Sequence, residues 1–307
     1  MATLISLAAL DALSDDDQQA STIVFLMCCF NRRAKTLNAL QCISEQEVSN
    51  AVSVAVVLFD DNSDDGTVEA VRKAFPLVEI HRGDGDAYWA RGMAQAQALA
   101  LDVACPDYFC WLNDDVTLDP EALSVLLATS RACHDKAAVV GALTDAMTSE
   151  LTYSGYERVG PRPTQLLHVV PNGRPTPVDT FNGNAVLIPR FVYERVGSID
   201  PRYEHAFGDT DYGYRIARAG LKSVLAPRAV GQCFRNSFTG TWQDPLLGNR
   251  ERLALLVSRK GIPPRSFLYF QWQHGGVGCL VNVLGTYLHA IRTIFGSRKS
   301  VLPRHGR

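Results

Sequence analysis

Residues 109–120 read FCWLNDDVTLDP, and this stretch decides the expected architecture of the chain. An apolar run ends at Leu112 and is followed at once by Asn113, Asp114 and Asp115. A short, continuously apolar run of this kind is typical of a buried strand in a parallel sheet. Open α/β sheets bind ligands beyond the carboxyl ends of their strands, so the carboxylate pair stands where a site would form.

The chemistry of this pair indicates a divalent cation. Carboxylates without a neighbouring Cys or His are hard oxygen ligands, which suit Mg²⁺ or Mn²⁺ better than zinc. A cation held by one or two side chains usually completes its shell with water and substrate phosphates. Asp115 is the preferred metal ligand, and Asp114 shares the cation or reaches a ribose or a metal-bound water. The pair therefore predicts a metal–diphosphate site.

Apolar runs and helical patterns alternate from residue 22 to residue 133. The expected strands are Thr22–Cys29, Val52–Phe59, Val78–His81 and Tyr108–Leu112. Helical patterns follow them, the last over Pro120–Cys133 with Asp119 as its N-cap. This alternation predicts a doubly wound, mostly parallel α/β sheet whose strands end at one edge. The polar residues expected to converge there are Asn31, Asp60, Asp61, Asp114 and Asp115.

The second half of the chain is less regular. Further strands are expected at 137–142, 185–188 and 224–226, with helices at 190–196 and 208–219, and the proline-rich region 145–180 holds a hairpin or two. We divide the chain into an N-terminal tail (1–20), a catalytic domain (21–240) and a helical C-terminal extension (241–307). The nucleotide-binding half of the domain is 21–133 and the acceptor-binding half is 134–240.

Both ends of the chain contain apolar stretches. Residues 4–13 lack a preceding basic region and are broken by Asp11, so they predict a frayed tail or short helix rather than a signal peptide. Residues 277–295 are apolar but interrupted by Asn282, His289 and Arg292, and basic residues follow. This segment is too polar for a clear membrane span. It is either a helix packed on the domain or an interfacial helix on anionic lipid.

Composition excludes several classes of protein. The formal net charge of −2 over 307 residues gives no electrostatic footprint for nucleic acid. The eight cysteines show no C-x-x-C spacing, which argues against zinc and thioredoxin-like sites and favours reduced thiols in a cytoplasmic protein.

Five motifs in order resemble family 2 glycosyltransferases, which are inverting enzymes of the GT-A fold. The motifs are Phe30-Asn31-Arg32, DDNSDDGT at 60–67, LNDDVTLDPEAL at 112–123, the segment 183–203 and GDTDYGYRIARAG at 208–220. The resemblance covers roughly residues 21–235 and points to the bacterial type that builds cell-surface polysaccharide. It implies transfer of a sugar from a nucleoside-diphosphate sugar, with UDP favoured and dTDP or GDP left open, and with Mn²⁺ or Mg²⁺.

The resemblance also implies a role for each matching residue. Asp60 or Asp61 would hold the nucleotide base, and Asn113, Asp114 and Asp115 would form the DXD-type motif. Asn31 and Arg32 would lie on the donor side as well. The loop 83–93 resembles a bacterial donor-sugar loop, which would place Asp86, Trp89 and Arg91 near the donor sugar. The catalytic pair comprises Asp209, the favoured general base, and Asp211, its alternative because Gly208 replaces the usual Glu.

The implied acceptor is a glycan or a lipid-linked sugar, and the implied location is the cytoplasm, with peripheral contact at the inner face of the plasma membrane if the tail helix is interfacial. Two other classes of function compete. A sugar-phosphate nucleotidyltransferase would need a Gly-rich loop after the first strand, and Cys28–Arg33 contains no glycine. A catalytically silent binding module on the same scaffold would bind the donor without turning it over. Oligomeric state is not indicated by the sequence.

Overall fold

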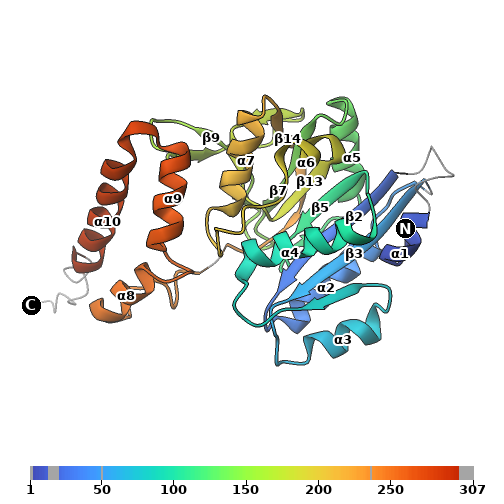
Figure 1. Cartoon of the computed structure of the whole chain (residues 1–307), viewed down its shortest axis with the longest axis horizontal. Helices are drawn as coiled ribbons and strands as arrows, with labels where there is room; N and C mark the ends of the chain where they lie inside the picture. Colours follow the sequence, from blue (N-terminus) through green and yellow to red (C-terminus); the bar gives the residue numbers. More distant parts are fainter. Residues whose placement is uncertain (1–2, 13–20, 50, 236, 297–307) are drawn as a thin grey trace, which may run out of the picture.

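The computed structural model describes residues 3–12, 21–49, 51–235 and 237–296 (Figure 1). Its described strands form an 11-stranded sheet, with the continuous order β1-β3-β2-β5-β13-β7-β14-β11, and a separate three-stranded sheet, β10-β9-β12. The strands of the large sheet are β1 (Thr3–Leu4), β2 (Ser21–Cys29), β3 (Val52–Asp60), β4 (Glu79–Arg82), β5 (Tyr108–Leu112), β6 (Thr117–Leu118), β7 (Ala137–Thr144), β8 (Leu151–Tyr153), β11 (Thr176–Val178), β13 (Ala185–Pro189) and β14 (Lys222–Gln232). The small sheet contains β9 (Gly155–Arg158), β10 (Leu166–His168) and β12 (Thr180–Phe181).

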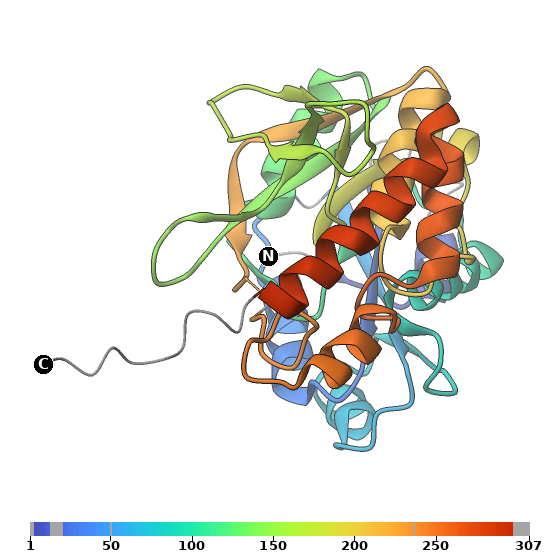
Figure 2. The same ribbon diagram turned by 90° about the vertical axis from the view of Figure 1, so that its left-hand side faces the viewer.

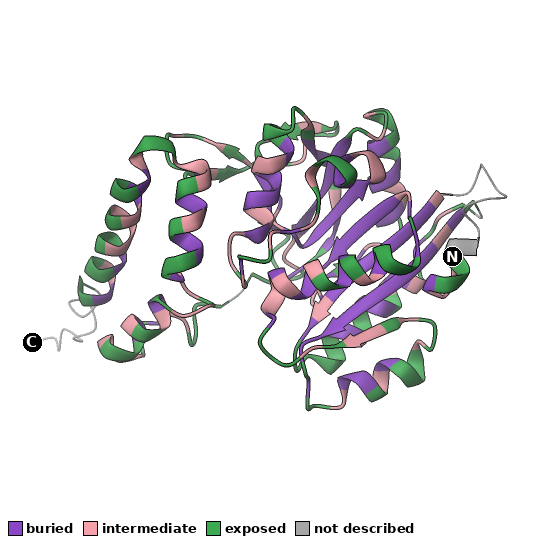
Figure 3. Cartoon of the chain, viewed as in Figure 1, coloured by how far each residue is buried: buried purple, intermediate pink, exposed green. Residues whose placement is uncertain are grey.

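The helices cover both faces of the large sheet, as expected of a doubly wound fold. Those of the domain are α1 (Leu7–Ala12), α2 (Arg33–Ser44), α3 (Thr67–Ala74), α4 (Tyr88–Val103), α5 (Ala122–Ala132), α6 (Arg190–Val196) and α7 (Gly208–Arg218). Buried side chains of α2, α3 and α5 pack on one face, and those of α1, α4, α6 and α7 pack on the other. Figure 3 shows the buried strands between these two layers.

The parallel strands predicted within residues 21–133 are present. Strands β2, β3, β4 and β5 pair in parallel, as the alternation of apolar runs and helices predicted. Strands β2, β3 and β5 are mostly apolar because side chains on both faces of the sheet are buried, and Phe25 and Phe59 are fully enclosed, whereas the short edge strand β4 is polar and partly exposed. The parallel pairing brings all four carboxyl ends to one edge.

Other expectations need correction. Strand β13 runs antiparallel between β5 and β7, so its first residues lie at the edge where the parallel strands end. Strand β14 is much longer than the expected 224–226. Helix α5 begins at Ala122 with Glu121 as N-cap, so the assignment of Asp119 as N-cap was wrong. A short strand and a turn through Asp119 come first, and the Asp119 carbonyl accepts the Ala122 N–H.

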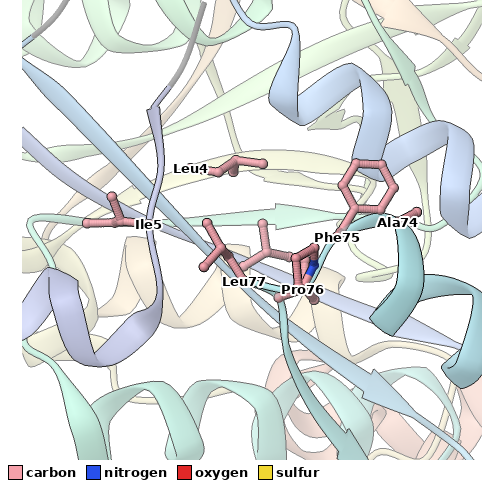
Figure 4. A pocket seen from close by; sticks show the side chains of 8 residues that line it. Leu4, Ile5, Ala74, Phe75, Pro76 and Leu77 are labelled. Carbon is pink, nitrogen blue, oxygen red and sulfur yellow. The ribbon is translucent and has the colours of Figure 1, made fainter.

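Residues 3–12 pack against the domain. Strand β1 pairs in parallel with β3, which the sequence did not predict, whereas the short helix α1 agrees with it. Leu7 and Leu10 are buried in the core. An apolar cavity of about 140 Å³ lies between β1 and the end of α3, lined by side chains such as Leu4 and Phe75 (Figure 4). It is lined by apolar residues alone, so we regard it as a packing seam.

The C-terminal extension forms a helical layer at one end of the molecule (Figure 1), and this layer faces the viewer in Figure 2. Its helices are α8 (Asn249–Leu256), α9 (Pro264–His274) and α10 (Cys279–Gly296). Helix α9 joins the core through Phe270, which stacks on Phe207 at 5.0 Å between ring centroids. Helix α10 buries Asn282, Ala290 and Ile294. The region 145–180 contains the expected hairpin, formed by β9 and β10.

Candidate active site

The residues predicted to converge do meet at the carboxyl edge of the sheet. In the ladder between β2 and β3, Cys29 pairs with Asp60, so Asp60 and Asn31 leave the sheet side by side. Arg32 follows and its Nη1 lies 3.0 Å from carboxylate oxygens of both Asp114 and Asp115. Segments more than 80 residues apart are thereby joined at one edge.

Asp114 and Asp115 differ in environment. Asp114 is buried and its Oδ2 has no hydrogen-bond partner, while Oδ1 accepts the bond from Arg32. Burial raises the pKa of Asp114 to about 6, although the Arg32 guanidinium acts in the opposite direction. Asp115 lies beside two cations, since its Oδ2 is 3.0 Å from Arg32 and 3.6 Å from Lys35 Nζ. The thiol of Cys233 lies 3.7 Å from its other oxygen. Sequence reasoning missed Lys35.

Asp60 and Asp61 reach the edge but their oxygens organise loops. Asp61 Oδ1 accepts N–H groups from Gly85 and Ala87, and Oδ2 accepts that of Tyr88. Asp60 Oδ2 accepts the Ser63 N–H at 2.9 Å. Both aspartates are buried, so Asp61 fixes the loop that follows β4 and Asp60 fixes the turn that follows β3.

A continuous set of contacts connects the carboxylate pair to the second half of the chain. The indole Nε1–H of Trp89 donates to Asn113 Oδ1 at 2.7 Å, and the Asn113 N–H donates to the Asn184 carbonyl at 3.0 Å. The next N–H back along the chain, that of Gly183, donates to Asp209 Oδ2 at 3.0 Å. A Cβ on Gly183 would lie 2.5 Å from the Trp89 ring and 3.3 Å from the Asp209 Cβ. The glycine allows Trp89 and Asp209 to approach each other.

The two candidate bases have different surroundings. Asp209 lies half-buried in the first turn of α7, where burial raises its pKa despite hydrogen bonds from the N–H groups of Gly183 and Thr210. Asp211 is 2% exposed, and both of its oxygens are occupied. Its partners are Arg215 Nε at 2.7 Å, His274 Nε2 at 2.8 Å and the Tyr203 hydroxyl at 3.2 Å. Asp211 therefore ties α7 to α9.

Two residues of the donor-sugar loop point elsewhere. Arg91 pairs with Glu204 at 3.2 Å, and Asp86 pairs with Arg259 from the segment after α8. Arg259 also reaches Glu204 at 2.9 Å, so a single ion-pair network links this loop to the C-terminal extension. Of the three loop residues predicted near the donor sugar, only Trp89 contacts the site's central residues. No local sequence signal identified Arg259, because its partners lie far away in the chain.

Tyr156 and Asn182 form a second polar group near Asp209, because Asn182 directly precedes Gly183. The Tyr156 hydroxyl donates to Asn182 Oδ1 at 2.6 Å, and the Tyr156 ring contacts that of His168 at 4.5 Å between centroids. A cavity of about 250 Å³ opens beside Asp115, which lines it together with Lys35, Phe234 and other residues.

Comparison with known proteins decides the family. Residues 20–260 match the family model described as glycosyltransferase like family 2. This chain is a family 2 glycosyltransferase. The glycosyltransferase is 28% identical over 218 residues to the N-acetylglucosaminyl-diphospho-decaprenol L-rhamnosyltransferase of Mycobacterium tuberculosis, in strains CDC 1551 and H37Rv. That alignment covers 62% of this glycosyltransferase and 69% of the relative.

Solved structures confirm the predicted GT-A fold of this glycosyltransferase. A structure of GalNAc-T7 with UDP, GalNAc and Mn²⁺ has a TM-score of 0.56 at 15% identity, covering 89% of this chain. The chain spans 58% of the length of that protein. A mannosyltransferase from Pyrobaculum calidifontis with GDP-Man and Mn²⁺ has a TM-score of 0.54 at 17% identity, covering 91% of this chain and 74% of its own.

Proposed function

We propose that this glycosyltransferase moves a sugar from a nucleoside-diphosphate sugar to an acceptor hydroxyl, with inversion at the anomeric carbon and with a divalent cation. The observation that carries the proposal is the link between the two halves of the site. Asn113 adjoins the carboxylate pair and is joined through Asn184 to Gly183, which bonds to Asp209. A metal-binding group and a candidate base are thus fixed relative to each other by adjacent strands.

The carboxylate pair fits a hard divalent cation. Asp114 Oδ2 is buried without a hydrogen-bond partner, which is costly unless a ligand satisfies it. Among the described residues no group of three or more His, Cys, Asp or Glu side chains is placed to hold a metal, so Asp114 and Asp115 would bind it as a pair. When bound, Mn²⁺ or Mg²⁺ would offset the charge that grows on the departing nucleoside diphosphate.

The chain's own residues would supply the remaining steps. Asp209 would take the proton from the acceptor hydroxyl as that oxygen bonds to the anomeric carbon. The bond from this carbon to the diphosphate breaks at the same time, and its electrons leave with the nucleotide. A raised pKa suits Asp209 to this role, because a base works best when its pKa lies near the working pH. Asp211 is less suited, since Arg215 and His274 occupy it.

Donor and acceptor are proposed at the level of chemical class. The name of the mycobacterial relative describes sugar transfer to a diphosphate-linked decaprenol, so we propose a glycan or lipid-linked acceptor for this chain. The solved neighbours hold UDP in one case and GDP-Man in the other, which leaves the donor base open among UDP, GDP and dTDP.

The deciding experiment measures binding and hydrolysis of UDP-, dTDP- and GDP-sugars with Mn²⁺, Mg²⁺ or EDTA. We expect one donor to be bound and turned over only with metal. Binding without turnover, even when candidate lipid-linked acceptors are supplied, would instead identify a silent binding module. Turnover that EDTA leaves unchanged would contradict the role of the carboxylate pair.

We also propose that α10 lies on the inner surface of the plasma membrane, on the cytoplasmic side. The segment Gly276–Gly296 has a mean hydropathy of 1.3 and is long enough to cross a membrane, yet only 22% of its apolar window is buried. The exposed apolar residues on α10 recur at helical spacing and include Leu280, Leu284 and Leu288, which are 63, 64 and 53% exposed. Such a face is typical of an interfacial helix.

Co-sedimentation with anionic liposomes tests this contact. The double variant Leu284→Ser/Leu288→Ser should lose binding, whereas Leu101→Ser, at a similarly exposed site on α4, should retain it. Equal sedimentation of the double variant and the wild type, or failure of the wild type to sediment, would contradict the proposal. The expected basic segment after residue 297 lies outside the described residues, so the test uses the full chain.

A further inference from the structure

The guanidinium of Arg32 occupies the space between the two proposed metal ligands. One nitrogen, Nη1, lies 3.0 Å from Asp114 Oδ1 and 3.0 Å from Asp115 Oδ2. These carboxylates are almost fully enclosed, with side-chain exposures of 6% and 11%, whereas the Arg32 side chain is 43% exposed. The cation is therefore the part of this bridge that is free to move toward solvent.

The bridge leaves the carboxylates incompletely satisfied. A guanidinium carries a single positive charge, and Asp114 Oδ2 remains buried with no hydrogen-bond partner. A divalent cation that contacts both side chains would supply twice the charge and could reach the free oxygen. Arg32 thus competes with the metal for the same two side chains.

Arg32 also stands at a helix end that favours anions. It is the N-cap of α2, and Lys35 lies in the first turn of that helix. Positive side chains at an N-terminus are opposed by the helix dipole, which attracts negative groups instead. In this structure Asp114 and Asp115 supply the compensating charge. With a metal on those carboxylates, Arg32, Lys35 and the helix end would be available to hold a diphosphate.

We propose that Arg32 is an exchangeable cation that couples metal binding to donor binding. Without metal it holds Asp114 and Asp115 in place; when the metal binds, it releases them and contacts the donor diphosphate together with Lys35. Metal and nucleotide should therefore bind cooperatively, and part of that cooperativity should reside in Arg32. This inference rests on the proposed function.

The test is a titration with Mn²⁺ in which electron paramagnetic resonance monitors free and bound Mn²⁺. It is done on the wild type and on Arg32→Met, with and without UDP, GDP or dTDP. Removing the competing cation should tighten binding of Mn²⁺ alone by about tenfold, a typical coupling between linked sites. The same variant should bind the nucleotide more weakly at saturating Mn²⁺. Arg32→Lys should keep most of the competition. Arg33→Met is the matched control, because the neighbouring Arg33 bonds to the turn after β3 through its backbone N–H, which the substitution keeps.

The outcomes separate the two proposals. Tighter binding of Mn²⁺ alone together with weaker nucleotide binding supports the exchange, because an arginine with only a structural role would lower both affinities or neither. Unchanged affinities in Arg32→Met, with a wild type that binds metal and nucleotide, would overturn the exchange and leave the proposed function intact. A wild type that binds Mn²⁺ but binds none of the three nucleotides would overturn both the exchange and the proposed function.

Discussion

The indole N–H of Trp89 donates a 2.7 Å hydrogen bond to the side-chain oxygen of Asn113. Trp89 belongs to the first turn of α4, and Asn113 is the first residue after β5. The bond fixes the amide of Asn113 beside the carboxylate pair and keeps the indole over Gly183, where a Cβ would collide with it. Asn113, on the proposed donor side, and Gly183, beside the proposed base, therefore pack against the same ring.

We expect Gly183→Ala to reduce transfer strongly without unfolding the protein. The new methyl group would push Trp89 or Asp209 aside, and a displacement of about 1 Å at a reacting group can cost about a hundredfold in rate. Steady-state kinetics and a melting curve would measure the two effects. Gly248→Ala is the control, because a Cβ there meets nothing within 4 Å. Full activity of Gly183→Ala would show that the approach of these residues is unimportant.

Asp115→Asn should abolish metal-dependent binding of the donor and lower turnover by at least about a hundredfold, since the metal contributes several kcal/mol of charge stabilisation. Isothermal titration with nucleotide and Mn²⁺ would measure the loss. Asp102→Asn, on the exposed side of α4, should behave as wild type. Wild-type affinity of Asp115→Asn for nucleotide plus Mn²⁺ would refute its assignment as a ligand.

The two aspartates of α7 should respond differently to the same substitution. Asp209→Asn should keep donor binding and lose about two to four orders of magnitude in transfer, the usual contribution of a general base. Asp211→Asn should mainly destabilise the fold, because removing one member of a buried ion pair costs about 3–5 kcal/mol. Single-turnover kinetics and chemical denaturation separate the effects. Loss of transfer by a fully stable Asp211→Asn would move the base to Asp211.

The raised pKa of Asp209 predicts that the rate of transfer, plotted against pH, declines on the acid side (the acid limb of the profile). Transfer should decline at a pH above the range in which an ordinary aspartate protonates, because the base must be charged. The effect on stability has the opposite sign. A carboxyl whose pKa is higher in the folded state favours folding as pH falls through that pKa. The activity should therefore fall while the contribution of Asp209 to stability rises, as parallel rate and melting measurements would show.

Asp114 also has a raised pKa, about 6, and varying the Mn²⁺ concentration separates its effect on the rate profile from that of Asp209. Protons and Mn²⁺ compete for a ligand carboxylate, so added Mn²⁺ should move that part of the acid limb to lower pH. The part that belongs to Asp209 should not move. If added Mn²⁺ does not change the pH at which the rate declines, Asp114 is not a metal ligand.

The sequence predicted the parts of the fold that depend on local pattern. Continuous apolar runs identified β2, β3 and β5, and parallel pairing then required their polar ends to meet, so Asp60 and Asp114 were placed correctly at one edge. The direction of β13 could not be predicted, because its five apolar residues read the same in either orientation. The roles of side chains were harder still. Asp211 belongs to a network completed by His274, 63 residues away, and no periodicity encodes that pairing.

The reversed direction of β13 has a consequence for how such enzymes diversify. Because this strand starts at the edge that carries the carboxylates, the spacing between the proposed metal ligands and the proposed base depends on the backbone ladder between β5 and β13. The region 145–180 lies outside that ladder and approaches Asp209 through the bond of Tyr156 to Asn182 and the bond of the Thr180 hydroxyl to the Thr210 carbonyl. If this region contacts the proposed acceptor, we expect insertions or exchanges in its loops to change acceptor specificity while the β5–β13 ladder stays intact.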